Sequence, residues 1–64
     1  MLIRFAPIGK SSWKVQRLGR TNRMLTIARV RRRSRRVMLV TPTRPFTACE
    51  SDAIRRWMDI LLDG

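Results

Sequence analysis

The segment TPTRP, residues 41–45, divides the chain into two parts with different hydrophobic periods. Before this segment, apolar residues alternate with polar ones, which is typical of half-buried strands. After it, helical spacing separates the apolar residues Ala53, Ile54, Trp57, Met58 and Leu61. Because prolines interrupt both ladders and helices, we expect strands before this segment and one helix after it.

Four short segments have the composition of strands: residues 2–6, 13–18, 24–31 and 36–40. We expect the first to be an edge strand that Pro7 ends, since proline cannot donate to a ladder. In the second, Trp13 and Val15 share one face. The segment GRTN, residues 19–22, supplies the Gly and Asn of a turn before the third strand.

Strict alternation along the third strand predicts which side chains share a face. It groups Leu25 and Ile27 with Arg29 and Arg31, and it directs Met24, Thr26, Ala28 and Val30 to the opposite face.

The helix is predicted over residues 48–62. Thr47 and Glu50 have the spacing of a capping box, in which each side chain accepts a backbone N–H of the other residue. Asp52 with Arg56, and Arg55 with Asp59, are spaced to form ion pairs one turn apart. Gly64 is placed to end the helix.

These elements predict an α+β fold of one small domain over residues 1–64. Three or four antiparallel strands form a sheet, and the C-terminal amphipathic helix packs on one face, because neither element can bury its apolar side alone. The expected packing residues are Trp13, Ile54, Trp57 and Leu61. The other sheet face is then left with many of the arginines.

The charge is distributed unevenly along the chain. There are 15 basic and 4 acidic residues, for a net charge of +11, and residues 1–46 contain no Asp or Glu. Codon usage in a GC-rich genome could favour Arg over Lys, but it does not readily explain the absence of acids. The many positive charges of residues 1–46 repel one another, which destabilises the folded chain. A polyanionic partner would reduce this repulsion.

The run RRRSRR, residues 31–36, lies between two predicted strands and therefore at a hairpin tip. It could contact phosphates or base edges, act as a localisation signal, or form a solvated turn. We favour contact with a polyanion, because the run lies in the acid-free part of the chain. The candidate contact residues are Arg17, Arg29, Arg31, Arg32, Arg33, Arg35 and Arg36, followed by Lys14, Arg20 and Arg23.

Residue content argues against several function classes. The chain has one cysteine, Cys49, and no histidine, which excludes an internal disulfide and a Ser-His arrangement and makes a zinc site implausible. We expect no enzymatic activity, no metal and no cofactor. No apolar run is long enough to span a bilayer, so we expect no membrane partner. We expect a cytoplasmic location in a bacterial or phage-infected cell, where the protein could associate with the nucleoid.

In order along the chain, Trp13, the strand Arg36–Val40, Phe46-Thr47 and the helix containing Ala53 resemble small sheet-plus-helix DNA-binding domains. These include the arm-binding domains of integrases and the plant ethylene-response domain. The resemblance is architectural and covers about residues 13–61. It implies a sheet that reads a groove with the helix packed behind it. The compact form is also similar to small phage-encoded proteins, including inhibitors of host enzymes.

Two functions from different classes follow. In the first, the protein is a non-enzymatic nucleic-acid-binding module that uses its basic sheet face and hairpin. In the second, it is a small phage-type inhibitor or adaptor that docks on an acidic surface of a host protein such as a polymerase or nuclease. The sequence leaves open the choice among DNA, RNA and an acidic protein, and also whether the chain forms a homodimer.

Overall fold

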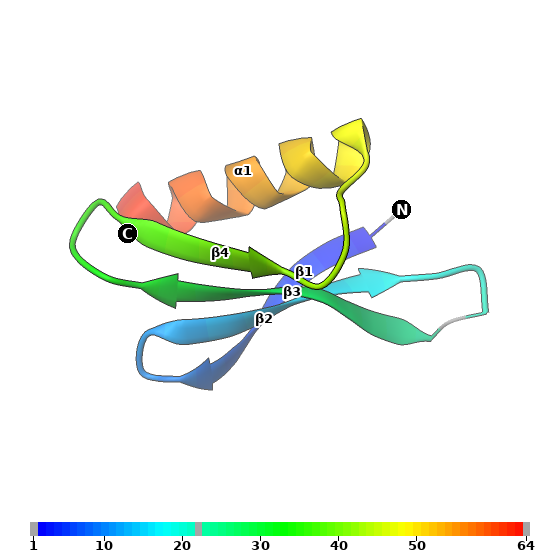
Figure 1. Cartoon of the computed structure of the whole chain (residues 1–64), viewed down its shortest axis with the longest axis horizontal. Coiled ribbons are helices and arrows are strands. Elements are labelled where there is room, and N and C mark those ends of the chain that lie inside the picture. Colours follow the sequence, from blue (N-terminus) through cyan, green and yellow to red (C-terminus); the bar gives the residue numbers. More distant parts are fainter. Residues whose placement is uncertain (1, 22, 64) are drawn as a thin grey trace.

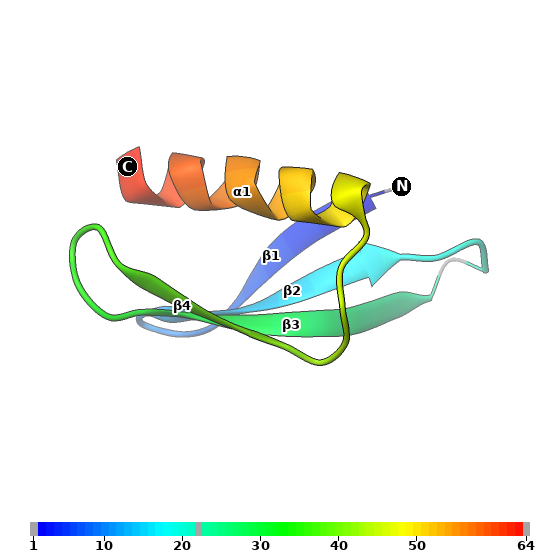
Figure 2. The same cartoon turned by 45° about the horizontal axis from the view of Figure 1, so that its top comes forward.

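The computed structural model describes residues 2–21 and 23–63. An antiparallel sheet with strand order β1-β2-β3-β4 is followed by one helix, α1, which lies along one face of the sheet (Figure 1). The elements are β1 (Leu2–Gly9), β2 (Ser12–Leu18), β3 (Met24–Arg32), β4 (Met38–Pro42) and α1 (Ala48–Asp63). The predicted α+β class is therefore confirmed, with four strands. No other described element covers the face turned away from α1 (Figure 2).

The core lies between α1 and the sheet. Its buried side chains come from three strands and the helix: Ile3, Phe5, Val15, Ile27, Ala28, Val30 and Ile54. The other predicted packing residues, Trp13, Trp57 and Leu61, are half-buried against this core. Burial of these apolar surfaces is the main force that holds the helix on the sheet.

Trp57 attaches the helix to β1 by two contacts. Its ring stacks on Phe5 with the centroids 5.5 Å apart. Its indole Nε1 donates to the carbonyl oxygen of Ile3 at 3.0 Å. The indole thus buries an apolar surface and also satisfies its single donor.

The first strand is longer than predicted, because Pro7 does not end it. β1 continues to Gly9, and Pro7 pairs with Trp13. β1 is an edge strand, as expected. A proline is tolerated there when its nitrogen faces away from the neighbouring strand. The ladder then shifts register between Pro7 and Gly9.

The predicted faces of β3 were wrong on both sides of Ile27: Leu25, paired with Arg17, shares the face of Ala28 and Val30, whereas Thr26, paired with Gln16, shares the face of Arg29 and Arg31. The register between β2 and β3 shifts between Val15 and Gln16, so that Val15 pairs with Ala28 while Gln16 pairs with Thr26. This β-bulge inserts Ile27 as an extra residue. Ile27 is therefore buried together with Ala28, whereas Leu25 is 57% exposed.

The last strand lies two residues further along the chain than predicted. The amide of Val37 donates to the carbonyl of Ser34 at 3.4 Å, and the amide of Ser34 donates to the carbonyl of Val37 at 3.3 Å; these bonds close the turn before β4 begins at Met38. β4 includes Pro42, which pairs with Ala28 at the end of an edge strand. The predicted break of the sheet by prolines therefore begins after Pro42.

Helix α1 begins and ends close to the predicted bounds. The capping box is confirmed: the Thr47 amide donates to Glu50 Oε1 at 2.9 Å, and the Glu50 amide donates to Thr47 Oγ1 at 3.2 Å. Arg56 pairs with Asp52 at 3.6 Å as predicted. The expected Arg55–Asp59 pair is not among the ion pairs of the described residues.

The turn between β2 and β3 lies where GRTN predicts it. The amide of Gly19 donates to the carbonyl of Arg23 at 3.0 Å. Asn22, the predicted turn residue, and Gly64, the predicted end of the helix, lie outside the described residues.

Candidate nucleic-acid interface

The sheet face opposite α1, called here the open face, gathers cations from three strands. In the sheet register Ala6 pairs with Lys14, and Lys14 pairs with Arg29. Paired residues share a face, and Trp13 and Val15, the neighbours of Lys14, point to the core. By the same alternation the open face carries four cations: Arg4, Lys14, Arg29 and Arg31.

Lys14 and Arg29 lie directly opposite each other on adjacent strands. Like charges in that position destabilise a sheet. No acidic residue lies on the open face, because the 4 acids of the chain are all in α1. The repulsion would fall if an anion bound between the two side chains.

Arg4 belongs to this group although it was not among the predicted contact residues. Its Nε donates to Gln16 Oε1 at 3.0 Å, across the strands β1 and β2. That bond directs the guanidinium over the open face and leaves its terminal nitrogens available. The sequence contained the signal, since Arg4 alternates with the buried Ile3 and Phe5.

A shallow depression of about 310 Å³ lies on the open face near the hairpin. Arg29 and Arg31 line it together with Ser12, Thr41 and the exposed Leu39. Two guanidinium groups beside two hydroxyl groups supply donors of the kind that bind phosphate oxygens.

The arginines of RRRSRR have three placements, of which Arg31 on the open face is the first. Arg32 donates from Nε to the carbonyl of Ser34 at 3.3 Å and from Nη2 to the carbonyl of Arg35 at 3.0 Å. It therefore stabilises the turn from within. Three exposed arginines remain at the tip: Arg33, Arg35 and Arg36.

Arg17 lies on the core side of the sheet, apart from the open face. Its Nη1 donates to Glu50 Oε2 at 2.9 Å. Arg44 binds the same carboxylate through both terminal nitrogens, at 2.9 and 2.8 Å. The Glu50 side chain is 0% exposed, whereas those of Arg17 and Arg44 are 37% and 40% exposed.

These contacts hold Glu50 in its ionised form. The hydrogen bonds from Arg44, together with the Thr47 amide and the charge of Arg17, lower the pKa of Glu50 to about 2, although burial acts in the opposite direction. A buried carboxylate needs such partners to remain charged. Arg17 thus has a structural role that its place in the sequence did not indicate.

The remaining candidates lie at the other end of the sheet. Arg20 and Arg23 are exposed in the β2–β3 turn, and the arginines of the β3–β4 loop are at the opposite end of the strands (Figure 1). The molecule is 36 Å long in this direction. This length is close to one turn of duplex DNA, about 34 Å.

The aromatic residues lie on the helix side. Phe5, Trp13, Phe46 and Trp57 are all buried or half-buried against the core. The chain contains no further Phe or Trp and no Tyr. The open face therefore has no aromatic ring on which an unpaired base could stack.

Comparisons with known proteins give no relative: no family model, no curated protein and no solved structure matches the chain. The described residues contain no group of three or more side chains that could hold a metal ion. Helix α1, the one helix described, lacks the length and apolar character that a bilayer crossing requires.

Proposed function

We propose that this protein binds nucleic acid without catalysing a reaction, and that the open face and the tip of the β3–β4 loop contact the phosphates. The observation that carries the proposal is the cross-strand pair Lys14–Arg29, set among Arg4 and Arg31 on an uncovered face without acids. The cations of the open face repel one another in the free protein, so binding of a polyanion there would lower the electrostatic free energy most.

The position of the aromatic rings favours a duplex over a single strand. Proteins that bind single strands stack bases on exposed aromatic rings, and here the rings face the core. A twisted sheet with basic side chains can instead follow the phosphates of a double helix. The families that the sequence resembles use their sheets in this way.

The contact is electrostatic and therefore depends on salt. Seven cations lie on the open face and at the loop tip: Arg4, Lys14, Arg29, Arg31, Arg33, Arg35 and Arg36. If all of them met phosphates of duplex DNA, log K would fall with log salt with a slope of about −6.

The test compares two double variants that remove the same charge from opposite sides of the molecule. Arg29→Ala/Arg31→Ala changes the open face, and Arg55→Ala/Arg56→Ala changes the exposed side of α1. Binding to a labelled duplex and to the matching single strand is measured by anisotropy over a range of salt concentrations.

We expect the open-face variant to bind the duplex on the order of tenfold more weakly, with a slope about 2 units shallower. The helix variant should bind nearly as the wild type does. Equal losses in both variants would show that only net charge matters. Absence of duplex binding at low salt would refute the proposal and favour an acidic protein as the partner.

A further inference from the structure

Strand β4 has an outer edge that pairs with no other strand of the described chain. The amide of Thr43 donates to the carbonyl of Ile27 at 2.9 Å, which continues the β3–β4 ladder. Because bonded and non-bonded pairs alternate along an antiparallel ladder, the register directs the backbone groups of Met38 and Val40 away from β3. Their amides and carbonyls are therefore available to a further strand.

The other edge of the sheet is less able to accept a strand. In β1, Pro7 has no amide proton, and the ladder shifts register between Pro7 and Gly9. The carbonyl of Ile3 already accepts the indole of Trp57. Proline, a bulge and a covering side chain are devices that block an edge. Of these blocking features, β4 has only a proline, Pro42, which lies at the end of the strand.

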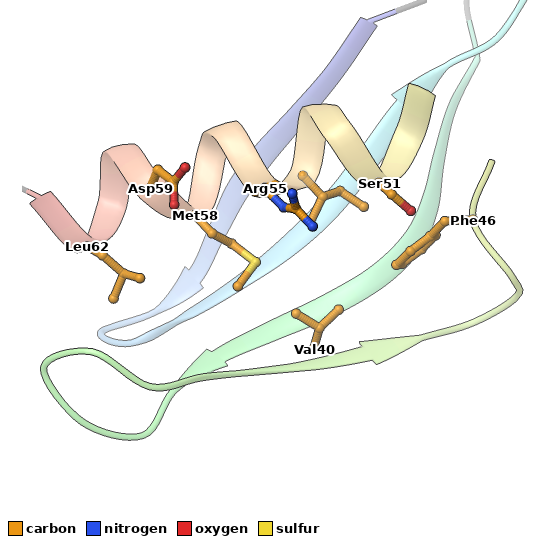
Figure 3. A pocket seen from close by; sticks show the side chains of 8 residues that line it. Val40, Phe46, Ser51, Arg55, Met58, Asp59 and Leu62 are labelled. Atoms are coloured by element: carbon orange, nitrogen blue, oxygen red, sulfur yellow. The ribbon is translucent and has the colours of Figure 1, made fainter. Parts of the chain in front are cut away.

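An apolar groove of about 290 Å³ lies beside the open edge, between β4 and α1 (Figure 3). Val40 of β4 and Phe46 of the connector line one side, and Met58 and Leu62 of α1 line the other. Ser51, Arg55 and Asp59 of α1 complete the lining. A strand residue paired with Val40 would direct its side chain to the same face as Val40. That side chain would lie over the groove and bury its apolar walls.

The alternate residues of an added strand would lie on the open face, beyond Leu39 and Thr41. Leu39 pairs with Arg31, and Thr41 pairs with Arg29. The added residues would thus be two strand spacings, about 10 Å, from the arginine backbones. An arginine and a glutamate side chain together span that distance, so carboxylates at these positions could pair with both guanidinium groups.

We propose that β4 binds an extended segment of a partner protein as an additional antiparallel or parallel strand. In this segment apolar side chains, which enter the groove, alternate with carboxylates, which meet Arg29 and Arg31. Backbone bonds at the edge supply affinity, and the alternation of side chains supplies selectivity. This inference does not depend on nucleic-acid binding.

A second copy of the chain fits the edge less well than an acidic segment. Two β4 strands paired around Val40 would place Pro42 opposite Met38, and the missing proline amide would cost a bond at each end. The pairing would also bring together two molecules of net charge +11. Charge complementarity therefore favours a different, acidic partner.

The experiment uses a synthetic peptide in which Glu alternates with Val and Leu. A control peptide has the same composition, with the glutamates in one block and the apolar residues in another. Binding to the full chain is followed by amide chemical shifts in NMR spectra. Leu62→Asp replaces an apolar wall of the groove with a carboxylate, and Ile60→Asp makes the same change at a helix position that is 65% exposed.

We expect the alternating peptide to shift the amides of Met38–Thr41 and to bind about tenfold more weakly to the Leu62→Asp variant than to the Ile60→Asp variant. Both variants should retain binding to a nucleic-acid duplex, which separates this inference from the proposed function. Equal binding of the two peptides, or equal affinity of the two variants, would overturn the proposal. Self-association through β4 in sedimentation experiments, without peptide binding, would also overturn it.

Discussion

Arg17 Nη1 lies 2.9 Å from Glu50 Oε2, and this contact joins the middle of the sheet to the first turn of α1 across 33 residues of sequence. Glu50 also completes the capping box with Thr47 and binds Arg44 by two hydrogen bonds. One buried carboxylate therefore fixes three things: the start of the helix, the connector before it, and the strand β2.

The stability of the fold should depend on pH through Glu50. Its pKa in the folded protein, about 2, lies below its ordinary value of 4.5. The folded state thus binds fewer protons than the unfolded state between these values. The contribution of Glu50 to stability is complete above about pH 5 and is lost as the pH falls toward 2. Urea unfolding at a series of pH values, followed by tryptophan fluorescence, measures it.

The control for this prediction is Glu50→Gln, which keeps the shape of the side chain but cannot titrate. We expect it to unfold more easily at pH 7, by about 1–3 kcal/mol, because hydrogen bonds to a charged group are lost. Its stability should change less than that of the wild type between pH 5 and pH 2. An identical pH profile in both proteins would assign the acid sensitivity to other carboxylates.

Arg17 and Arg29 should have opposite effects when each is replaced by Met. Arg17→Met removes one partner of a buried carboxylate, and we expect a loss of about 1–3 kcal/mol in the free energy of unfolding with little change in duplex binding. Arg29→Met removes one half of a repelling cross-strand pair, so the fold should be as stable or slightly more stable. Duplex binding should weaken. If Arg17→Met weakened binding as strongly, Arg17 would belong to the interface.

The loop arginines should also separate into two kinds. We expect Arg33→Ala/Arg35→Ala to reduce the salt slope of duplex binding by about 2 units while leaving the stability within about 0.5 kcal/mol. Arg32→Ala removes two hydrogen bonds to loop carbonyls and should increase the mobility of the loop, measured by NMR relaxation of its amides. A loop that is equally rigid in the Arg32→Ala variant would contradict the internal role of Arg32.

Trp57→Phe should test the attachment of the helix to β1. Phenylalanine can keep the stack on Phe5 but cannot donate to the Ile3 carbonyl. We expect the free energy of unfolding to fall by about 1–2 kcal/mol from the lost hydrogen bond and the smaller buried ring. Trp13 remains as the fluorescent probe. No measurable change would mean that water replaces the indole at this carbonyl without cost.

The bulge in β3 can be tested by alanine at two neighbouring positions. Ile27→Ala should destabilise the fold by about 2–4 kcal/mol, since it removes buried methyl groups from the core. Leu25→Ala should change stability by no more than about 0.5 kcal/mol, because that side chain is exposed. Strict alternation without the bulge would predict similar effects at both positions. Chemical denaturation of the two variants decides between these outcomes.

The local features of this protein could be read from its sequence. Alternation at Trp13 and Val15, the proline-containing break near residue 42, and the Thr47–Glu50 spacing depend on neighbouring residues alone. They predicted the strands, the helix and its cap, and the fold class. That Arg29 and Arg31 share one face also followed, because a strand has a period of two, although the same rule wrongly grouped Ile27 with them.

Tertiary structure decided which positions depart from those local rules. The β-bulge that buries Ile27 arises from pairing with β2, and Pro7 is accommodated because β1 lies at an edge. The pairing of Arg17 with Glu50 requires β2 and α1 to be packed together. Alternation and helical spacing describe one element at a time, whereas these features arise where two elements meet. The sequence therefore determined the elements and the overall charge, and packing decided which arginines remain exposed and which, like Arg17, are held by Glu50.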